Sequence, residues 1–412
     1  MAAAALSVSI LTAQTAPHPL WPGARYSTED RDQAIYRGMQ FLYQTASKPK
    51  VFAEWGFDLL WCFWSISNTA QDSKLRQMAR DMGRERAVEW RRIHARLSTK
   101  DDANRLCNVI FGADAATRLG YPDDRFKEKI RAAVARFDVR DFLDFDAAKE
   151  PPPSDIPKGC PKCGRIWPRG TKTCPRDGSP LRMKSRYDVW SDALITAYTG
   201  DIYGITLGAP YRDVLKWIGV MRPYASRSQV STLEFYNITY CITHIIYTLN
   251  DYNQYRISPE WLPEEYAYLK TNLEEAVRLK DPETLGEFLD TLRAFGMTED
   301  DSLIRTGVDY VLSRQNRDGS WGDPKDRDAY NRYHSTWTAI DGLRQYAYQG
   351  ERLGFPELMP LLRGARSATI TAHLESSPAR YPIHAKAQRK TQRTPRLVRM
   401  FTCVLGVLAR TS

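Results

Sequence analysis

The sequence predicts an all-α protein built from about six helical hairpins and interrupted by one short insert. Apolar residues recur at helical spacing through most of the chain, and no series of Val/Ile/Thr-rich alternating segments indicates a sheet. Two segments near opposite ends also share one layout. The 412 residues, 42% of them hydrophobic and 26% charged, suffice for one large or two ordinary domains with a buried core.

The first part of the helical region spans residues 27–150 and precedes the insert. Ser27 or Thr28 can cap its first helix, an aromatic-rich helix follows, and the third helix is long and amphipathic. The predicted helices cover residues 27–46, 53–70, 74–97, 100–120 and 124–145.

The insert, residues 151–184, contains a cysteine pattern typical of a metal site. Cys160 and Cys163 form a CPxCG turn, and Cys174 opens a second turn, "CPRDG", in which Asp177 takes the place of a fourth Cys. Such turns direct thiolates toward one tetrahedral centre, and a carboxylate can also ligate zinc. The pattern resembles bacterial zinc ribbons that end in "CPxDG". We expect structural zinc, since four protein ligands leave no open position; the alternatives are a metal-free relic, or a shell completed by water or a distant group instead of Asp177.

The second part of the helical region, residues 185–364, contains the counterpart of a segment in the first part. "YRGMQFLYQ" followed by "WGFDLLWCFWSI" has the same layout as "RTGVDYVLSRQ" followed by "YHSTWTAIDGLR". Such helix pairs bury their faces only against neighbours, in an open solenoid or a closed ring, and similar units at both ends favour closure. Helices are predicted at residues 186–200, 209–222, 229–251, 261–279, 282–296, 300–315 and 333–349.

Two adjacent motifs near the end of this region resemble known families. "RQNRDGSWGDP" resembles the Gln-to-Trp repeat of squalene and hopene cyclases, and "DAYNRYHSTWTAIDGL" is similar to the Tyr-His segment of protein prenyltransferase β subunits. The resemblance implies an (α/α)6 toroid, with six inner and six outer helices around a cavity. It also places His334 where prenyltransferases have a histidine ligand of catalytic zinc. The accompanying Asp-x-Cys element is absent, as are the Asp-x-Asp-Asp and Asp-Asp-x-x-Asp motifs of cyclisation chemistry.

The first of these motifs has an architectural interpretation. We expect Gln315 to cap backbone groups beside the next helix, while Gly319 and Gly322 let the chain turn around Trp321.

The candidate catalytic residues lie in aromatic-rich helices. Of six histidines, only His244 and His334 have such a context, and Asp58, Asp188 and Asp192 share it. We predict that the histidines are acid/base groups or ligands of a second metal (Zn, Fe or Mn), with the three aspartates as supporting carboxylates. Each histidine could instead satisfy a buried hydrogen bond.

One face of the segment 229–251 is polar and has no Lys or Arg, which favours an enclosed cavity over a wet surface. The residues of this face are Glu234, Asn237, Cys241, His244, Thr248 and Asp251.

These features predict an enzyme that acts on a hydrophobic, isoprenoid or lipid-like molecule in a cavity lined by aromatic groups and carboxylates. The alternative is a non-catalytic binding or scaffold protein with a structural zinc site. Nucleic acid is not an expected partner, because the positive charge is concentrated in the tail. The net charge is +10, but residues 366–412 alone carry nine Lys/Arg against one acid, which leaves the rest of the chain near neutral. The basic tail, residues 365–412, either touches an anionic membrane surface or a partner, or is disordered.

The cysteine usage favours a reducing, cytoplasmic location, because three of the seven cysteines fall in the one metal-like cluster. No segment has the roughly 18 apolar residues of a membrane-spanning helix. The start, "MAAAALSVSILTAQTA", is apolar, yet the first basic residue is Arg25, so export is the less favoured alternative.

Overall fold

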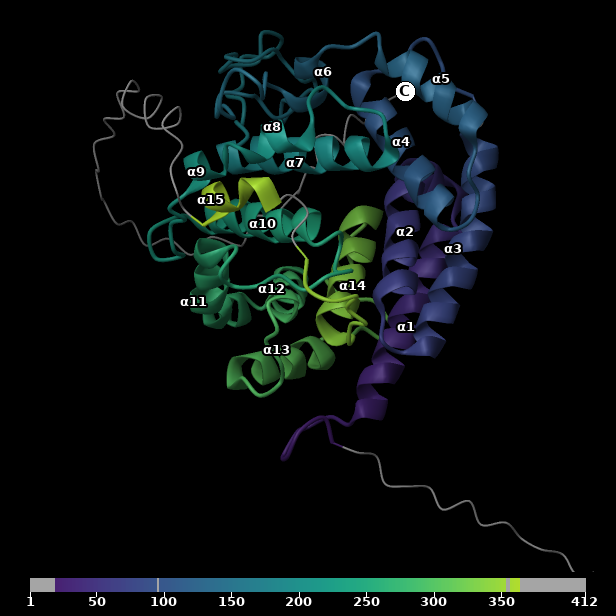
Figure 1. Ribbon diagram of the computed structural model, residues 1–412, viewed down its shortest axis with the longest axis vertical. Helices are drawn as coiled ribbons and strands as arrows, with labels where there is room; N and C mark the ends of the chain where they lie inside the picture. Colours follow the sequence, from purple (N-terminus) through teal and green to yellow (C-terminus); the bar gives the residue numbers. More distant parts are fainter. Residues whose placement is uncertain (1–18, 95, 353–355, 364–412) are drawn as a thin grey trace, which may run out of the picture.

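A computed structural model describes residues 19–94, 96–352 and 356–363 (Figure 1). The secondary structure of these residues is helical. They contain isolated β-bridges but no β-strand, which confirms the all-α prediction. None of the described helices is long and apolar enough to cross a membrane. The apolar start and the basic tail of residues 365–412 lie outside the described residues.

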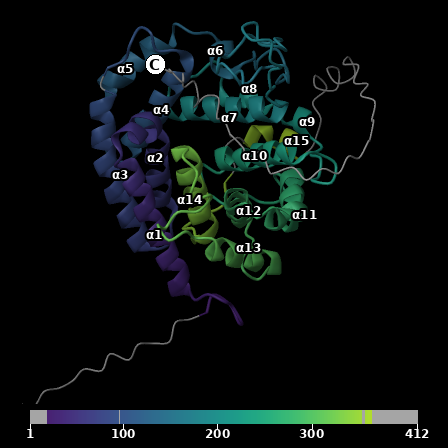
Figure 2. The same ribbon diagram turned by 180° about the vertical axis from the view of Figure 1, so that it is seen from behind.

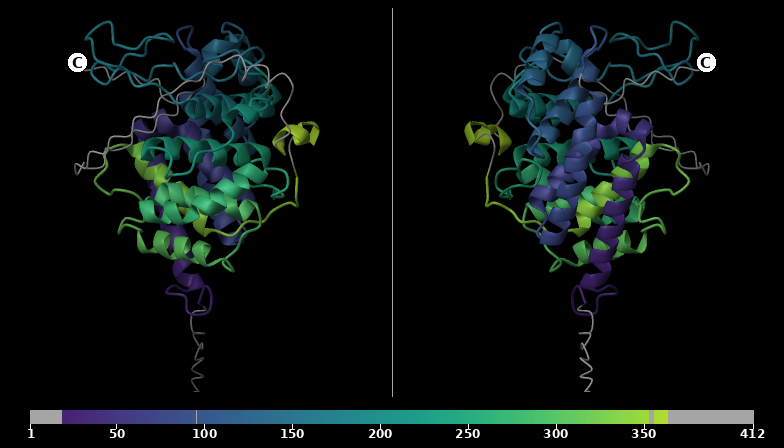
Figure 3. Two further views of the ribbon diagram at one scale, coloured as in Figure 1. Left: turned by 90° about the vertical axis from the view of Figure 1, so that its left-hand side faces the viewer. Right: turned by 90° about the vertical axis from the view of Figure 1, so that its right-hand side faces the viewer.

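The helices fall on either side of a non-helical segment that includes the predicted insert. Before it are α1 (Thr28–Ala46), α2 (Pro49–Thr69), α3 (Ser73–Ile93), α4 (Ala103–Arg118), α5 (Asp124–Val134) and α6 (Val139–Leu143). After it are α7 (Arg186–Tyr203), α8 (Tyr211–Leu215), α9 (Ile218–Met221), α10 (Thr232–Leu249), α11 (Pro263–Leu279), α12 (Pro282–Ala294), α13 (Ser302–Ser313), α14 (Ala329–Leu343), the 3₁₀ helix η1 (Pro356–Leu358) and α15 (Met359–Leu362). The non-helical segment projects beside α6, as Figures 1 and 3 show.

Six helices form a circuit of contacts. Helix α2 packs against α4, α4 against α7, α7 against α10, α10 against α12 and α12 against α14, and α14 returns to α2. Other helices pack on this circuit: α1 and α3 on α2, α5 on α4, α8 on α7, and α11 and α13 on α12. The two opposite views in Figures 1 and 2 show this repeated pairing. The chain thus has a helical-repeat character, in which one helix of a unit continues the circuit and another covers it.

Helices α12 and α14 approach closely because glycines lie at their contact. A Cβ atom added to Gly286 would lie only 2.3 Å from the carbonyl oxygen of Thr338. One added to Gly342 would lie 2.9 Å from the Cα of Gly286. Backbone therefore packs directly on backbone at this contact.

The link between α13 and α14 ties the last helical unit to the first. The Gln315 amide donates hydrogen bonds to the carbonyl oxygens of Ala34 on α1 (2.7 Å) and Gly319 (3.0 Å). Gln315 thus caps backbone groups as predicted, although one of them belongs to α1. Gly319 and Gly322 have φ values of +87° and +86°, and the buried Trp321 indole between them donates to the Val311 carbonyl oxygen at 2.7 Å. The turn around Trp321 is confirmed.

Several predicted helices have different bounds, and the segment predicted at 209–222 forms two short helices, α8 and α9. The segment predicted at 124–145 is interrupted, because the Asp138 side chain accepts bonds from the backbone N–H groups of Arg140 and Asp141 and starts a new helix. The last hairpin helix begins at Ala329 rather than residue 333, since Asp328 caps it. It ends at Leu343, where Arg344 becomes extended.

We predict that Gly286→Ala lowers the free energy of unfolding by about 3 kcal/mol, because the added methyl group meets backbone that cannot move independently of α14. Gly307→Ala is the matched control: its nearest contact is the Leu289 side-chain tip at 2.9 Å, which can rotate away. We expect a change of less than about 1 kcal/mol there. Urea denaturation measures both, and equal effects would contradict the role assigned to Gly286.

Candidate functional site

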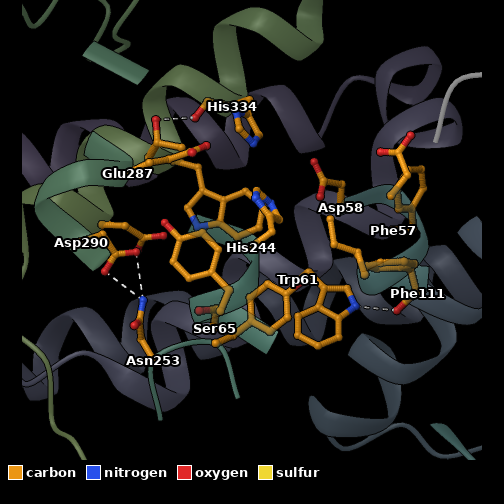
Figure 4. Close-up of a pocket in the computed structure, with 17 residues that line it drawn as sticks. Phe57, Asp58, Trp61, Ser65, Phe111, His244, Asn253, Glu287, Asp290 and His334 are labelled. Carbon is orange, nitrogen blue, oxygen red and sulfur yellow. Dashed lines mark hydrogen bonds between the residues drawn. The ribbon is translucent and has the colours of Figure 1, made fainter. Parts of the chain in front are cut away.

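A cavity lies at the centre of the helix circuit, and all six helices contribute to its lining (Figure 4). The volume that the centres of water molecules can occupy in this cavity is about 70 Å³, enough for several waters or a small organic group. No Lys or Arg of the described part of the chain belongs to the lining. Its acidic residues are Asp58, Asp192, Glu287, Asp290 and Asp341; its histidines are His244 and His334; its aromatic residues are Phe57, Trp61, Phe111, Tyr247, Tyr252 and Trp337.

His334 on α14 is held by a carboxylate of α12. Its Nδ1 lies 3.0 Å from Oε1 of Glu283, and the Ser335 hydroxyl donates to the other Glu283 oxygen at 3.1 Å. Because the carboxylate accepts, Nδ1 carries the proton. Burial alone would lower the pKa of His334, but the negative charges of Glu283, Asp58 and Glu287 outweigh it, so the pKa is raised. His334 therefore holds a proton more readily than a free imidazole.

His244 on α10, in contrast to His334, is oriented to accept a proton. Its Nδ1 lies 2.8 Å from the carbonyl oxygen of Tyr240, which can only accept, so Nδ1 is the protonated nitrogen. In the neutral ring the lone pair is therefore on Nε2. The neighbouring Thr243 hydroxyl donates to Oε2 of Glu287 at 2.9 Å, which connects α10 to α12. Figure 4 shows His244, His334 and Asp58 around a common space.

Asp58 on α2 faces these histidines. Burial raises the pKa of its carboxyl group, opposed by the charge of His334 and by a hydrogen bond from the Tyr333 hydroxyl at 2.7 Å. A carboxyl group whose pKa is raised in an aromatic-lined cavity can act as a general acid closer to neutral pH than an exposed aspartate can.

A second acidic group lies at the α12–α14 contact. Asp290 accepts hydrogen bonds from the Asn253 amide at 2.9 Å, and Asp341 accepts one from Nε of Arg344 at 2.6 Å. Burial and the charge of Asp341 raise the pKa of Asp290 to about 7, although Arg344 opposes the shift. Burial likewise raises the pKa of Asp341 against the effect of Arg344.

Four of the five candidate catalytic residues line the cavity, and Asp188 does not. Asp192 is on the lining, 3.8 Å from Nζ of the buried Lys184. Asp188 lies one turn earlier, where it completes the capping box of α7 with Ser185 and forms a 3.0 Å ion pair with Lys158. Its place in the first turn of α7 leaves it outside the cavity, so its predicted supporting role needs correction.

The polar face predicted for the segment 229–251 does not form one continuous cavity wall. His244 reaches the lining, whereas Glu234 near the start of α10 accepts a hydrogen bond from Asn237 at 3.2 Å. Cys241 is buried in the core, and Asp251 accepts the Tyr198 hydroxyl. The helix packs against both α7 and α12, so side chains of one face enter different surroundings along its length.

The acidic face of α12 belongs to the site but is not among the residues predicted from the sequence. Glu283, Glu287 and Asp290 are spaced by four and three residues, so they share one side of the helix. Every residue of α12 is buried. Three acids at helical spacing among Leu and Phe residues were the available signal, because a buried carboxylate is costly unless partners surround it.

Two groups of side chains can hold a metal ion. Ligand atoms of Glu283, Glu287 and His334 all lie within 4.8 Å of one another. Two carboxylates with one imidazole suit zinc, iron or manganese. The predicted ligand set of a second metal, His244 with His334, therefore differs from this group. Here His334 is joined by the α12 carboxylates and not by His244.

The other group is the predicted ligand set of the insert. Ligand atoms of Cys160, Cys163, Cys174 and Asp177 also lie within 4.8 Å of one another. The sulfur atoms of Cys163 and Cys174 are 3.7 Å apart, and an oxygen of Asp177 is 3.3 Å from the sulfur of Cys160. The residues are therefore placed to share one metal ion, and none of them lines the central cavity.

Neither a protein-family model nor a curated protein sequence matches this chain. The function is therefore inferred from the geometry of the two groups and of the cavity.

We predict that Asp290 makes stability fall as pH rises from about 4 to about 7. Its folded pKa of about 7 lies above the ordinary value of 3.8, so the folded state retains a proton that the unfolded chain releases. Relative to Asp290→Asn, the wild-type free energy of unfolding should fall by on the order of 2–4 kcal/mol over this range. Denaturation at several pH values measures the difference.

Asp81→Asn, which removes an exposed carboxylate on α3, is the charge-matched control for this series. A difference between wild type and Asp290→Asn that stays constant from pH 4 to 7 would show that Asp290 titrates alike in both states.

Proposed function

We propose that the helical region is an (α/α)6 toroid and that the protein is an enzyme acting on a hydrophobic, isoprenoid or lipid-like molecule in its central cavity. The circuit of α2, α4, α7, α10, α12 and α14 supports six inner helices, and the helices packed on them support an outer layer. The resemblance of the segment around Trp321 and His334 to squalene cyclases and prenyltransferases is consistent with the same arrangement.

The observation that carries the enzymatic proposal is the chemistry of the lining. Carboxyl groups and imidazoles gather inside a shell of aromatic rings, and none of the described residues of the lining is a Lys or Arg. A scaffold protein gains stability by filling such a centre with apolar side chains, whereas these acids are retained at an energetic cost. Groups with raised pKa values in a cavity are typical of proton-transfer sites.

The same lining favours an uncharged substrate. Its carboxylates repel anions, and the aromatic faces contact hydrocarbon and stabilise positive charge that develops during a reaction. The space of about 70 Å³ admits a small group or one end of a longer molecule. We infer that the reactive end of the substrate occupies this space and that the remainder of the molecule stays outside it.

The residues have separate roles in this proposal. Asp58 donates a proton, and His244 accepts one at Nε2. His334, oriented by Glu283, is either the second acid/base group or, with Glu283 and Glu287, a ligand of a divalent cation. Such a cation would supply Lewis-acid chemistry. Proton transfer would then fall to Asp58 and His244.

We predict that the purified protein binds and converts neutral isoprenoid compounds, and that Asp58→Asn reduces conversion at least 100-fold while preserving binding. Liquid chromatography with mass spectrometry measures conversion across a panel of isoprenoid alcohols and hydrocarbons. Glu54→Gln, an exposed acid one turn earlier on α2, is the matched control and should retain wild-type conversion.

The outcomes separate the two functions. Binding without conversion by the wild type would favour the non-catalytic binding protein. Absence of saturable binding across the panel would contradict the hydrophobic substrate class.

We also propose that the insert is a zinc ribbon with a structural role. Three thiolates and one carboxylate around a common centre match the ligand preferences of zinc. We predict about one zinc per chain, lost in Cys160→Ser and retained in His334→Ala. Elemental analysis of the purified proteins measures both.

A second metal that disappears only in His334→Ala would assign the cluster of Glu283, Glu287 and His334 as a metal site as well. Zinc retained in full by Cys160→Ser would contradict the ribbon.

A further inference from the structure

A separate recess lies among α2, α3 and α4, and its charge is opposite to that of the central cavity. It has a volume of about 260 Å³. Among the described residues, its lining includes Arg80, Arg84 and Arg118 but no Asp or Glu. The two spaces share none of the described lining residues. Trp61 lines the central cavity, and Trp64 lines the recess. The two rings pack edge to face, with centroids 4.7 Å apart.

Arg118 at the end of α4 is held in a fixed orientation. Its Nε donates to Asp114 at 2.7 Å, and its guanidinium carbon lies 4.4 Å from the centre of the Trp64 ring. The ion pair uses one edge of the planar group, and the ring supports its face. A guanidinium fixed in this way loses little side-chain entropy when its remaining N–H groups bind a ligand.

Arg80 and Arg84 add two exposed guanidinium groups, one turn apart on α3. Neither forms an ion pair with any described residue. Asn68 faces them from α2, and its Nδ2 has no hydrogen-bond partner among the described residues. Arg118 is already paired with Asp114, whereas the like charges of Arg80 and Arg84 repel each other, and a bound anion would remove that cost.

We propose that this recess is a binding site for a phosphate-type oxyanion, held by Arg80, Arg84 and Arg118. The planar guanidinium group matches phosphate oxygens in pairs, and three such groups can surround a single phosphate. The phosphate belongs either to a free phosphorylated molecule or to an anionic lipid headgroup, since both present the same oxygens to the arginines.

Isothermal titration of the full chain with inorganic phosphate and pyrophosphate, at constant ionic strength set with sodium chloride, tests the free-ligand source. We expect saturable binding that weakens at least tenfold in Arg80→Gln and in Arg84→Gln. Arg125→Gln removes one positive charge from an exposed position on α5 outside the recess and should bind as the wild type does. Arg80 and Arg84 are both exposed, so these variants should fold normally, which circular dichroism verifies.

Co-sedimentation with phosphatidylcholine vesicles, with and without phosphatidic acid, tests the lipid source. Binding that requires phosphatidic acid and is lost in the Arg80→Gln/Arg84→Gln double variant supports the site with a lipid headgroup as ligand. The site is overturned if neither probe binds saturably. It is also overturned if the recess variants bind as the wild type does, or if Arg125→Gln weakens binding equally, because the effect would then reflect charge elsewhere on the chain.

Discussion

The central site depends on the direct backbone contact between α12 and α14. Gly286 leaves no room for a side chain against Thr338, and Gly342 approaches the Cα of Gly286. This contact brings Glu283 within hydrogen-bonding distance of His334 and Ser335. Any wider spacing would separate the carboxylate from the imidazole and leave both buried without their partners, which costs more than the bond itself contributes.

Partners drawn from distant parts of the chain make the buried acids of the site tolerable. Asp58 on α2 receives the Tyr333 hydroxyl from α14, and Asp290 on α12 receives the amide of Asn253. The buried Arg344 bonds Asp341 and also Thr69 at the end of α2, so one guanidinium connects the last and first parts of the circuit. The interactions that keep the acids in place are thus also interactions that hold the circuit together, and the site and the fold share their stabilising contacts.

Local patterns predicted the helices and much of the site, but not how far along a helix the cavity extends. Asp188 and Asp192 have the same local context, yet one turn separates an acid that caps α7 from one that lines the cavity. The polar face of α10 shows the same limitation, because its members meet different neighbouring helices. Helical spacing indicates which residues share a side of a helix. Whether a residue on that side reaches the cavity depends on where the next helix crosses.

The sequence alone determined the helical class, the turn around Trp321 and the metal-type spacing of the insert, because each arises from residues close together in the chain. Periodic apolar residues, two glycines and a CPxCG turn need no distant partner to be interpreted. Only the tertiary structure decided that Glu283 and Glu287 join His334, and that arginines of α3 and α4 share a recess with α2. These groupings lie across helix contacts, and the approach of two helices depends on packing at their interface, which no short stretch of either sequence specifies by itself.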